Sequence, residues 1–318
     1  MRRCLRARYG GGCCEQRRAK DKRVKLRRKQ AVCGASASWR VRLWLGLCVG
    51  LFLFGMTGCP AQLVLVRPYP VPKTETLLLS IAKQQQAIKS ARFRTKADVP
   101  DDQGGRVKLD VSFAVKRPMW LRVEAESALA GALLTLTTDG QRYQLFDVRN
   151  QRYVDSPMSA CSMALFLRVS VPPALLMDAL LGSLPILGGQ PVELGWDKEQ
   201  GGREKLTLRR EQGESQILYF KWDKDSGGFD AVETLLLDAN GKPDVRIRHD
   251  GFSTTQDETD QHQTVRIPKY TVVENVAQKS EARLRRKESE VNAILSNDVF
   301  VLSKPPGTTQ EADPCVAP

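Results

Sequence analysis

The sequence offers few side chains that could carry out covalent chemistry. Histidine occurs twice in 318 residues, as His249 and His262. The motifs G-x-S-x-G, G-x-x-x-x-G-K-[ST], G-x-G-x-x-G and H-E-x-x-H are absent, and no pair of nucleophile and base can be assembled. An isolated histidine near a polar strand end is typical of a solvated surface, so we expect both to be exposed. The sequence therefore predicts a protein that is not an enzyme and needs no cofactor.

One acidic stretch imitates a metal-binding loop. Asp223–Gly228 follows the spacing of a calcium loop, but the twelfth position holds Thr234, and Glu233 falls one residue short of it. Strand-like sequence flanks the stretch on both sides. We therefore expect a hairpin turn here and no metal site.

A cysteine ends an apolar segment near the N-terminus. The 16 residues Leu43–Gly58 carry no charge, follow Arg40 and Arg42, and are ended by Cys59. A membrane span needs about 20 residues, so the positive flank and short apolar core predict a secretory signal peptide. A buried helix with an incidental cysteine and an uncleaved anchor are the alternatives.

The residues at the end of this segment resemble a lipobox. Met56, Thr57, Gly58 and Cys59 are similar to the cleavage site of bacterial lipoproteins, where leucine is more usual at the place of Met56. The resemblance implies that the mature protein begins at Cys59 and carries acyl chains, such as palmitate, as a membrane anchor. Pro60 stands where an aspartate would resemble the inner-membrane retention signal. The resemblance thus implies the bacterial outer membrane, on its periplasmic face.

Residues 1–42 form a basic prefix that accounts for the whole net charge of +13. They hold 15 basic and 2 acidic residues, whereas residues 43–318 hold 34 of each. The prefix is long for a signal-peptide n-region, so we expect either a gene start placed too far upstream, with initiation at Val32 or Val41, or a cytosolic extension. Nucleic-acid binding needs a surplus of positive charge, so the neutral mature chain predicts no nucleic-acid partner. The cluster Arg283–Lys287 is interleaved with glutamates and predicts a solvated strand face.

Two further cysteines, Cys161 and Cys315, remain in the mature chain. In an oxidising compartment they make one possible disulfide, which would tie the C-terminal tail to the middle of the chain. Two free buried thiols are the alternative.

The mature chain is predicted to consist of a tether, helices and a sheet, and these elements position the residues discussed above. Four prolines in residues 59–73 predict an extended tether. Apolar residues at helical spacing predict a helix from Thr74 to Ala91, with Thr74 as its cap. Residues 157–189 are apolar, return to helical spacing and are split at Pro172 and Pro173.

Alternation of apolar and polar side chains predicts strands over most of the remaining chain. The predicted strands are 107–115, 119–125, 133–138, 142–146, 205–210, 216–222, 229–237, 244–248, 264–267 and 281–290. Asn240 and Gly241 predict a hairpin between two of them. The pattern predicts a mainly β (α+β) fold, in which a strongly curved antiparallel sheet forms an incomplete barrel and the helical insert serves as its lid.

The order of elements resembles the LolA/LolB-type lipoprotein-localisation fold, and in particular its lipid-anchored LolB-like branch. The similar stretches are Trp120–Asp147, Gln151–Pro157, Val171–Gly182 and Asp298–Gly307, the last resembling that fold's final strand and Pro-Gly end. The resemblance implies a half-barrel domain over residues 74–307, followed by a tail over residues 308–318. It also implies that acyl chains bind beneath the lid and that Leu129 matches an apolar residue on a protruding loop.

Apolar residues of the predicted sheet and lid are the candidates to line such a cavity, with packing in the core as the alternative for each. They are Phe113, Leu121, Val123, Leu134, Leu136, Leu145, Leu176 and Leu180. We therefore expect a lipoprotein that binds the acyl chains of lipoproteins or lipids, takes part in their trafficking and has a periplasmic carrier as partner. The alternative is an envelope interaction lipoprotein with a packed core, docking through residues 127–131.

Overall fold

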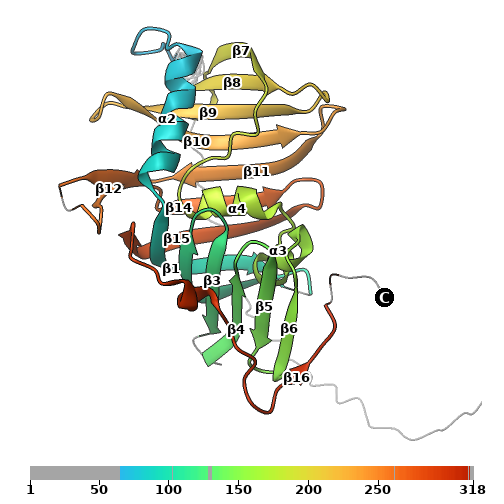
Figure 1. Ribbon diagram of the computed structural model, residues 1–318. Coiled ribbons are helices and arrows are strands. Elements are labelled where there is room, and N and C mark those ends of the chain that lie inside the picture. The colour runs from blue at the N-terminus through green and yellow to red at the C-terminus, as the bar shows by residue number, and fades with distance from the viewer. Residues whose placement is uncertain (1–64, 102, 128–130, 261, 314, 316–318) are drawn as a thin grey trace, which may run out of the picture. The chain divides into compact units, whose positions relative to one another are not determined.

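A single curved sheet dominates the computed structural model, which describes residues 65–101, 103–127, 131–260, 262–313 and 315 (Figure 1). Its strands are β1 (Ser90–Pro100), β2 (Arg106–Lys116), β3 (Trp120–Ser127), β4 (Gly131–Thr138), β5 (Arg142–Asp147), β6 (Arg152–Pro157), β7 (Gln190–Asp197), β8 (Arg203–Arg209), β9 (Ser215–Asp223), β10 (Gly228–Leu237), β11 (Pro243–Asp250), β14 (Tyr270–Asn275), β15 (Ser280–Val291) and β16 (Thr309–Gln310). A separate ribbon pairs β12 (Ser253–Gln256) with β13 (Thr264–Ile267). The helices are α2 (Thr74–Ala87), α3 (Ala160–Leu167), α4 (Pro173–Leu180) and the 3₁₀ turns η1 (Glu199–Gly201) and η2 (Asn297–Phe300).

The strand order explains why a helical segment must cross the sheet. Within the described residues the order is β16-β6-β5-β4-β3-β2-β1-β15-β14-β11-β10-β9-β8-β7, and all neighbours are antiparallel except β16 and β6. β6 and β7 therefore lie toward opposite edges of the sheet, although residues 158–189 join them directly. This connection runs over the concave face and carries α3 and α4. The sheet is not closed into a barrel, and its fold class is the one that the sequence predicts.

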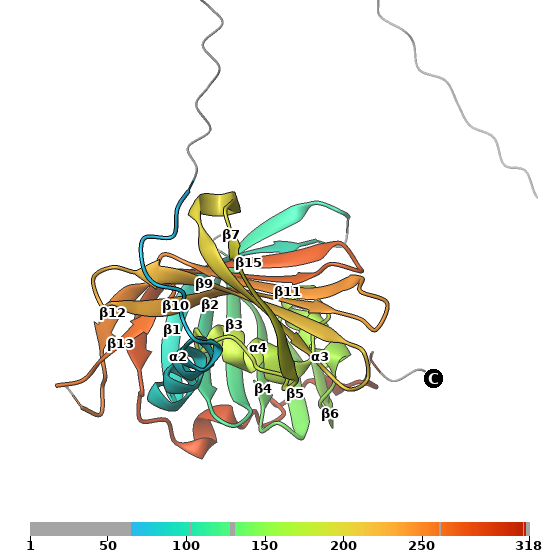
Figure 2. The same ribbon diagram turned by 90° about the horizontal axis from the view of Figure 1, so that it is seen from above.

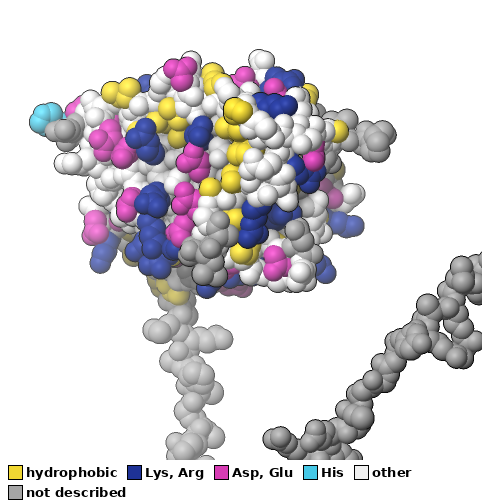
Figure 3. Space-filling view, turned by 90° about the horizontal axis from the view of Figure 1, so that it is seen from below, with side chains coloured by type: hydrophobic (Ala, Val, Ile, Leu, Met, Phe, Trp, Pro, Cys, Tyr) yellow, Lys and Arg dark blue, Asp and Glu magenta, His cyan; other side chains and the backbone are white. Residues whose placement is uncertain are grey.

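The core lies between the concave face and the helices (Figure 2). In several strands buried residues alternate with outward polar ones, as in β1, where Phe93 and Ala97 are buried and Arg94 and Lys96 are exposed. Helix α2 contributes Leu77 and Ile81, which are 0% and 1% exposed. None of the described helices is long and apolar enough to cross a membrane. On the face shown in Figure 3, basic and acidic side chains lie close together.

Several predicted boundaries are wrong. Lys73, and not Thr74, precedes the first helix as its cap residue, and the helix ends at Ala87. Ser90–Pro100 is the central strand β1, because its buried residues alternate with period two. Strands β6, β7, β12, β14 and β16 were also not among the predicted strands. The stretch Asp298–Gly307 is not a final strand: it contains most of η2, and the tail adds β16 to the sheet edge beyond it.

Candidate functional site

The lid consists of two short helices with different attachments to the sheet. Ser159 begins α3 with a capping box, in which its side chain accepts a hydrogen bond from the Ser162 amide at 3.2 Å. Pro173 occupies the first turn of α4. Both helices are apolar nearly throughout, so each can bury its inward face against the sheet; the lid residues Leu167 and Leu176 are both 0% exposed.

Polar contacts fasten the C-terminal end of α4. Arg117 Nη1 lies 2.7 Å from Asp178 Oδ1. Arg286 Nη2 donates to the Leu180 carbonyl at 2.8 Å, and His249 Nε2 lies 3.1 Å from the Ser183 carbonyl. Because a carbonyl only accepts hydrogen bonds, His249 Nε2 must carry the proton. These contacts fix α4 on the sheet.

His249 and Arg286 correct two predictions. Both were expected at a solvated surface, yet they are 3% and 9% exposed and lie on the concave side. Burial lowers the pKa of His249 to about 4 and the pKa of Arg286 to about 10, so at neutral pH the imidazole is neutral and the guanidinium is charged. The guanidinium lies 4.0 Å from the centre of the Phe93 ring. His262 is exposed, as predicted.

The predicted cavity residues come together where the lid packs on the sheet. Phe113 stacks on Phe93 with ring centres 4.9 Å apart and meets the edge of Phe166 from α3 at 5.6 Å. Seven of the eight belong to one cluster of buried side chains: Phe113, Leu121, Val123, Leu136, Leu145, Leu176 and Leu180. Leu134 is partly buried and packs against the same cluster. In this structure the centre of the concave face is packed core.

An apolar groove opens at one end of this core. It has a volume of about 600 Å³ and lies between α3 and the ends of strands β1 to β4. Its apolar lining comes from both sheet and lid: Val99, Val107, Leu109, Ala125, Leu133, Leu134, Leu165 and Phe166. Leu134 is the predicted residue that reaches this groove. The other lining residues were not among the predicted cavity residues. Val107 and Leu109 could have been included, because they belong to the same apolar alternation, over residues 107–115, as Phe113.

Polar groups form the rim of the groove. Asp101 Oδ1 accepts hydrogen bonds from the amides of Gln103 and Gly105 at 2.8 and 2.7 Å. Asp147 Oδ1 accepts from the amides of Arg149 and Asn150, each at 3.0 Å. These bonds shape turns. The apolar side chains come from the strands and from Leu165 and Phe166 of α3, and Arg168 at the C-terminal end of α3 adds a basic group to the lining. The arrangement suits a ligand with a long apolar part and a polar end at the rim.

The structure joins Cys161 to Cys315 by a disulfide, which ties the beginning of α3 to the C-terminal tail. The tail is held further by β16 and by Tyr143, whose hydroxyl donates to Asp313 at 2.7 Å. Lid helix α3 is thus attached to the edge of the sheet through the tail. The predicted lipid-bearing Cys59 and the predicted loop residue Leu129 lie outside the described residues.

The remaining polar motifs are turns and surface. Asp223 ends β9 and Gly228 begins β10, so the calcium-like stretch is the predicted hairpin turn, closed by Ser226 donating to Asp223. No group of three or more metal-ligating side chains occurs among the residues that the structure describes. In the cluster Arg283–Lys287, all but Leu284 and Arg286 are exposed.

No protein-family model matches the chain, and no curated protein matches it. Among solved structures, the chain is similar to a LolA superfamily protein from Nitrosomonas europaea, at 13% identity and a TM-score of 0.46, over 70% of this chain and 97% of that one. It is also similar to a domain from Vibrio parahaemolyticus named for outer membrane lipoprotein sorting, at 8% identity and a TM-score of 0.45, over 70% and 94%. A DUF1329 family protein from Desulfovibrio piger matches at 10% identity and a TM-score of 0.45, over 71% and 94%. The first is of the superfamily that the sequence resembles.

Proposed function

We propose that the protein is a non-enzymatic envelope lipoprotein that binds a hydrophobic ligand, an acyl chain of a lipoprotein or lipid, in the groove between α3 and the sheet. The observation that carries the proposal is the apolar lining of this groove of about 600 Å³, to which both lid and sheet contribute. Its size is in the range of small-ligand sites. Binding transfers apolar surface from water to protein, and no bond is made or broken.

The proposal includes the attachment of the protein to the membrane. Acyl chains on Cys59 anchor it to the outer membrane, and a periplasmic carrier delivers or receives the ligand. The lipobox-like residues Met56–Cys59 and the balanced charge of the mature chain support this part. The same charge balance supports a lipid ligand over a nucleic acid.

A fluorescent fatty acid tests the binding step. We expect stoichiometric binding to the soluble mature domain, checked by native mass spectrometry, and a Kd at least about tenfold higher in Leu134→Glu, because a carboxylate would be buried in the groove. Val107→Glu repeats the test at a second groove residue. Val107 is 38% exposed, so this substitution should not prevent folding. Ile294→Glu is the matched control, since Ile294 is 88% exposed and does not line the groove.

A second function is favoured by the packed centre of the concave face. Leu121, Val123 and Leu136 are each 0% exposed, as a closed interaction module requires. In that case the loop over residues 127–131 docks a partner protein. Absence of fatty-acid binding by the folded domain, together with one dominant protein cross-linked to it in intact envelopes, would support this function against the first.

A further inference from the structure

The proline-rich segment that precedes α2 is docked on the sheet. Arg67 forms a bidentate ion pair with Glu204, in which Nε lies 2.6 Å from Oε1 and Nη2 lies 3.0 Å from Oε2. The Glu204 side chain is 0% exposed. Trp196 Nε1 donates to the Leu65 carbonyl at 3.1 Å. The Tyr69 ring lies 4.8 Å from Trp222, centre to centre. The segment was predicted to be a tether, but residues 65–72 are part of the folded unit.

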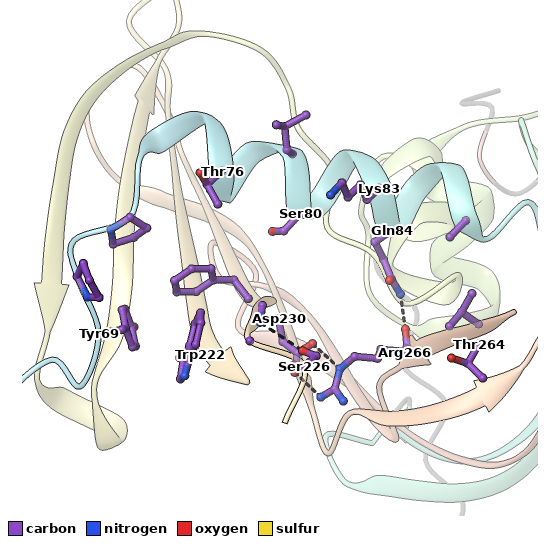
Figure 4. Close-up of a pocket in the computed structure, with 18 of the residues that line it drawn as sticks. Tyr69, Thr76, Ser80, Lys83, Gln84, Trp222, Ser226, Asp230, Thr264 and Arg266 are labelled. Atoms are coloured by element: carbon purple, nitrogen blue, oxygen red, sulfur yellow. Dashed lines mark hydrogen bonds and ion pairs between the residues drawn. The ribbon is translucent and has the colours of Figure 1, made fainter. Parts of the chain in front are cut away.

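Apolar side chains project from this docked segment and from the neighbouring helix. Val66 and Val71 are 74% and 64% exposed, and Leu79 of α2 is 56% exposed. Val71 and Leu79 lie at a groove of about 710 Å³ between α2, the segment, the β9–β10 turn and β13. Figure 4 shows Tyr69 and Trp222 side by side at one end of this groove. Exposed valine and leucine beside amphipathic aromatic rings suit the boundary between lipid and water.

The position of the predicted anchor limits where this surface can lie. Leu65 is six residues after Cys59, and six extended residues span at most about 20 Å. A free tether of fourteen residues would have let the domain stand off from the membrane in many orientations. Docking from Leu65 onward removes most of that freedom, so the docked end of the domain is held near the acyl chains.

We propose that this end of the domain is a membrane-contact surface, at which Val66, Val71 and Leu79 insert into the boundary of the bilayer beside the acyl anchor. The inference rests on the acylation of Cys59 that the proposed function includes. It adds an orientation: the docked segment and the N-terminal half of α2 face the lipid. The acyl-chain groove between α3 and the sheet lies elsewhere on the domain, lined by other residues.

Site-specific labels test the contact on the full-length mature protein, mixed with vesicles of phosphatidylethanolamine and phosphatidylglycerol. A polarity-sensitive dye is attached, without reduction, to Val71→Cys, to Leu79→Cys or to the control Ile294→Cys. We expect blue-shifted emission and roughly twofold or greater quenching by lipid-borne quenchers at positions 71 and 79, and neither effect at position 294. All three sites are more than half exposed, so folding should be retained.

Flotation of the vesicles separates the possible failures. Protein that does not float lacks the anchor, which overturns the acylation in the proposed function. Protein that floats while positions 71 and 79 remain unquenched overturns the membrane-contact surface alone. A blue shift without lipid quenching also overturns it, because a protein would then cover the surface. Tyr69→Ala should leave flotation intact and reduce quenching at position 71, since it frees the docked segment.

Discussion

At the scale of single residues, His249 makes stability depend on pH. Its pKa is lowered from the ordinary 6.5 to about 4 by burial, so between these values the unfolded chain binds a proton that the folded chain excludes. The free energy of unfolding should therefore fall as pH falls from 6.5 to about 4, by about 3 kcal/mol in total from this residue, and no further loss from it should follow below that range.

Denaturant titrations across this pH range check the prediction. His249→Gln should flatten the dependence between pH 6.5 and 4, because glutamine does not titrate. His262→Gln is the control, since His262 is exposed, and its profile should follow that of the parent protein. Equal pH dependence in His249→Gln and the parent would show that His249 is not buried in the neutral form.

The sequence does contain a signal that His249 and Arg286 are buried, but the polarity of the two side chains hides it. His249 follows Val245 and Ile247 at every second position of β11, and Arg286 follows Leu284 in the same way on β15. Alternation places both on the inner face, whereas polarity suggests the outer one. Polarity misled because each buried side chain finds a backbone carbonyl that lies far away in the chain, Leu180 at the end of α4 for Arg286 and Ser183 just after α4 for His249.

At the scale of elements, the disulfide is the attachment that distinguishes α3 from α4. It closes a loop of 154 residues, for which the loss of chain entropy in the unfolded state corresponds to about 5 kcal/mol. Replacing both partners, as Cys161→Ser with Cys315→Ser, should lower the free energy of unfolding by up to that amount. Hydrogen exchange should rise most in α3 and the tail, because ion pairs and hydrogen bonds still hold α4.

Two outcomes would contradict this account of the lid. One is a double variant as stable as the parent, which would mean that the tail contributes little in the folded state. The other is equal loss of exchange protection in α3 and α4, which would mean that the lid moves as one body. Reduction of the parent protein should reproduce the effect of the double variant.

The elements predicted best from sequence are those with a uniform period. The strands from β2 to β5 and from β8 to β11 were found within a few residues, and so was the helical character of the lid. Strand β1 was hidden because Ile88 and Ala91 also fit the helical spacing that precedes it. The docking of residues 65–72 could not be predicted, because its partners Trp196, Glu204 and Trp222 lie more than 120 residues away.

At the scale of the whole molecule, the position of the lid follows from strand order. The chain builds one half of the sheet up to β6, crosses the concave face, and builds the other half from β7 at the opposite edge. β1 then pairs with β15 to join the halves. Sequence can predict the strands and the apolar insert, but the pairing of β1 with β15 is a contact between distant segments.

The balanced charge of the mature chain leads to a prediction about how the whole molecule is held at a membrane. The chain has 34 basic and 34 acidic residues after residue 42, and the two kinds are intermingled on the face shown in Figure 3. Attachment should then depend on acyl chains and apolar side chains. Raising salt from about 0.1 to 1 M shortens the screening length from about 10 to 3 Å but leaves apolar burial intact, so flotation of the acylated protein with vesicles should not change. Cys59→Ala, which lacks the acyl acceptor, should fail to float at either salt concentration. Release of the acylated protein at high salt would assign the attachment to charge and contradict the apolar contact.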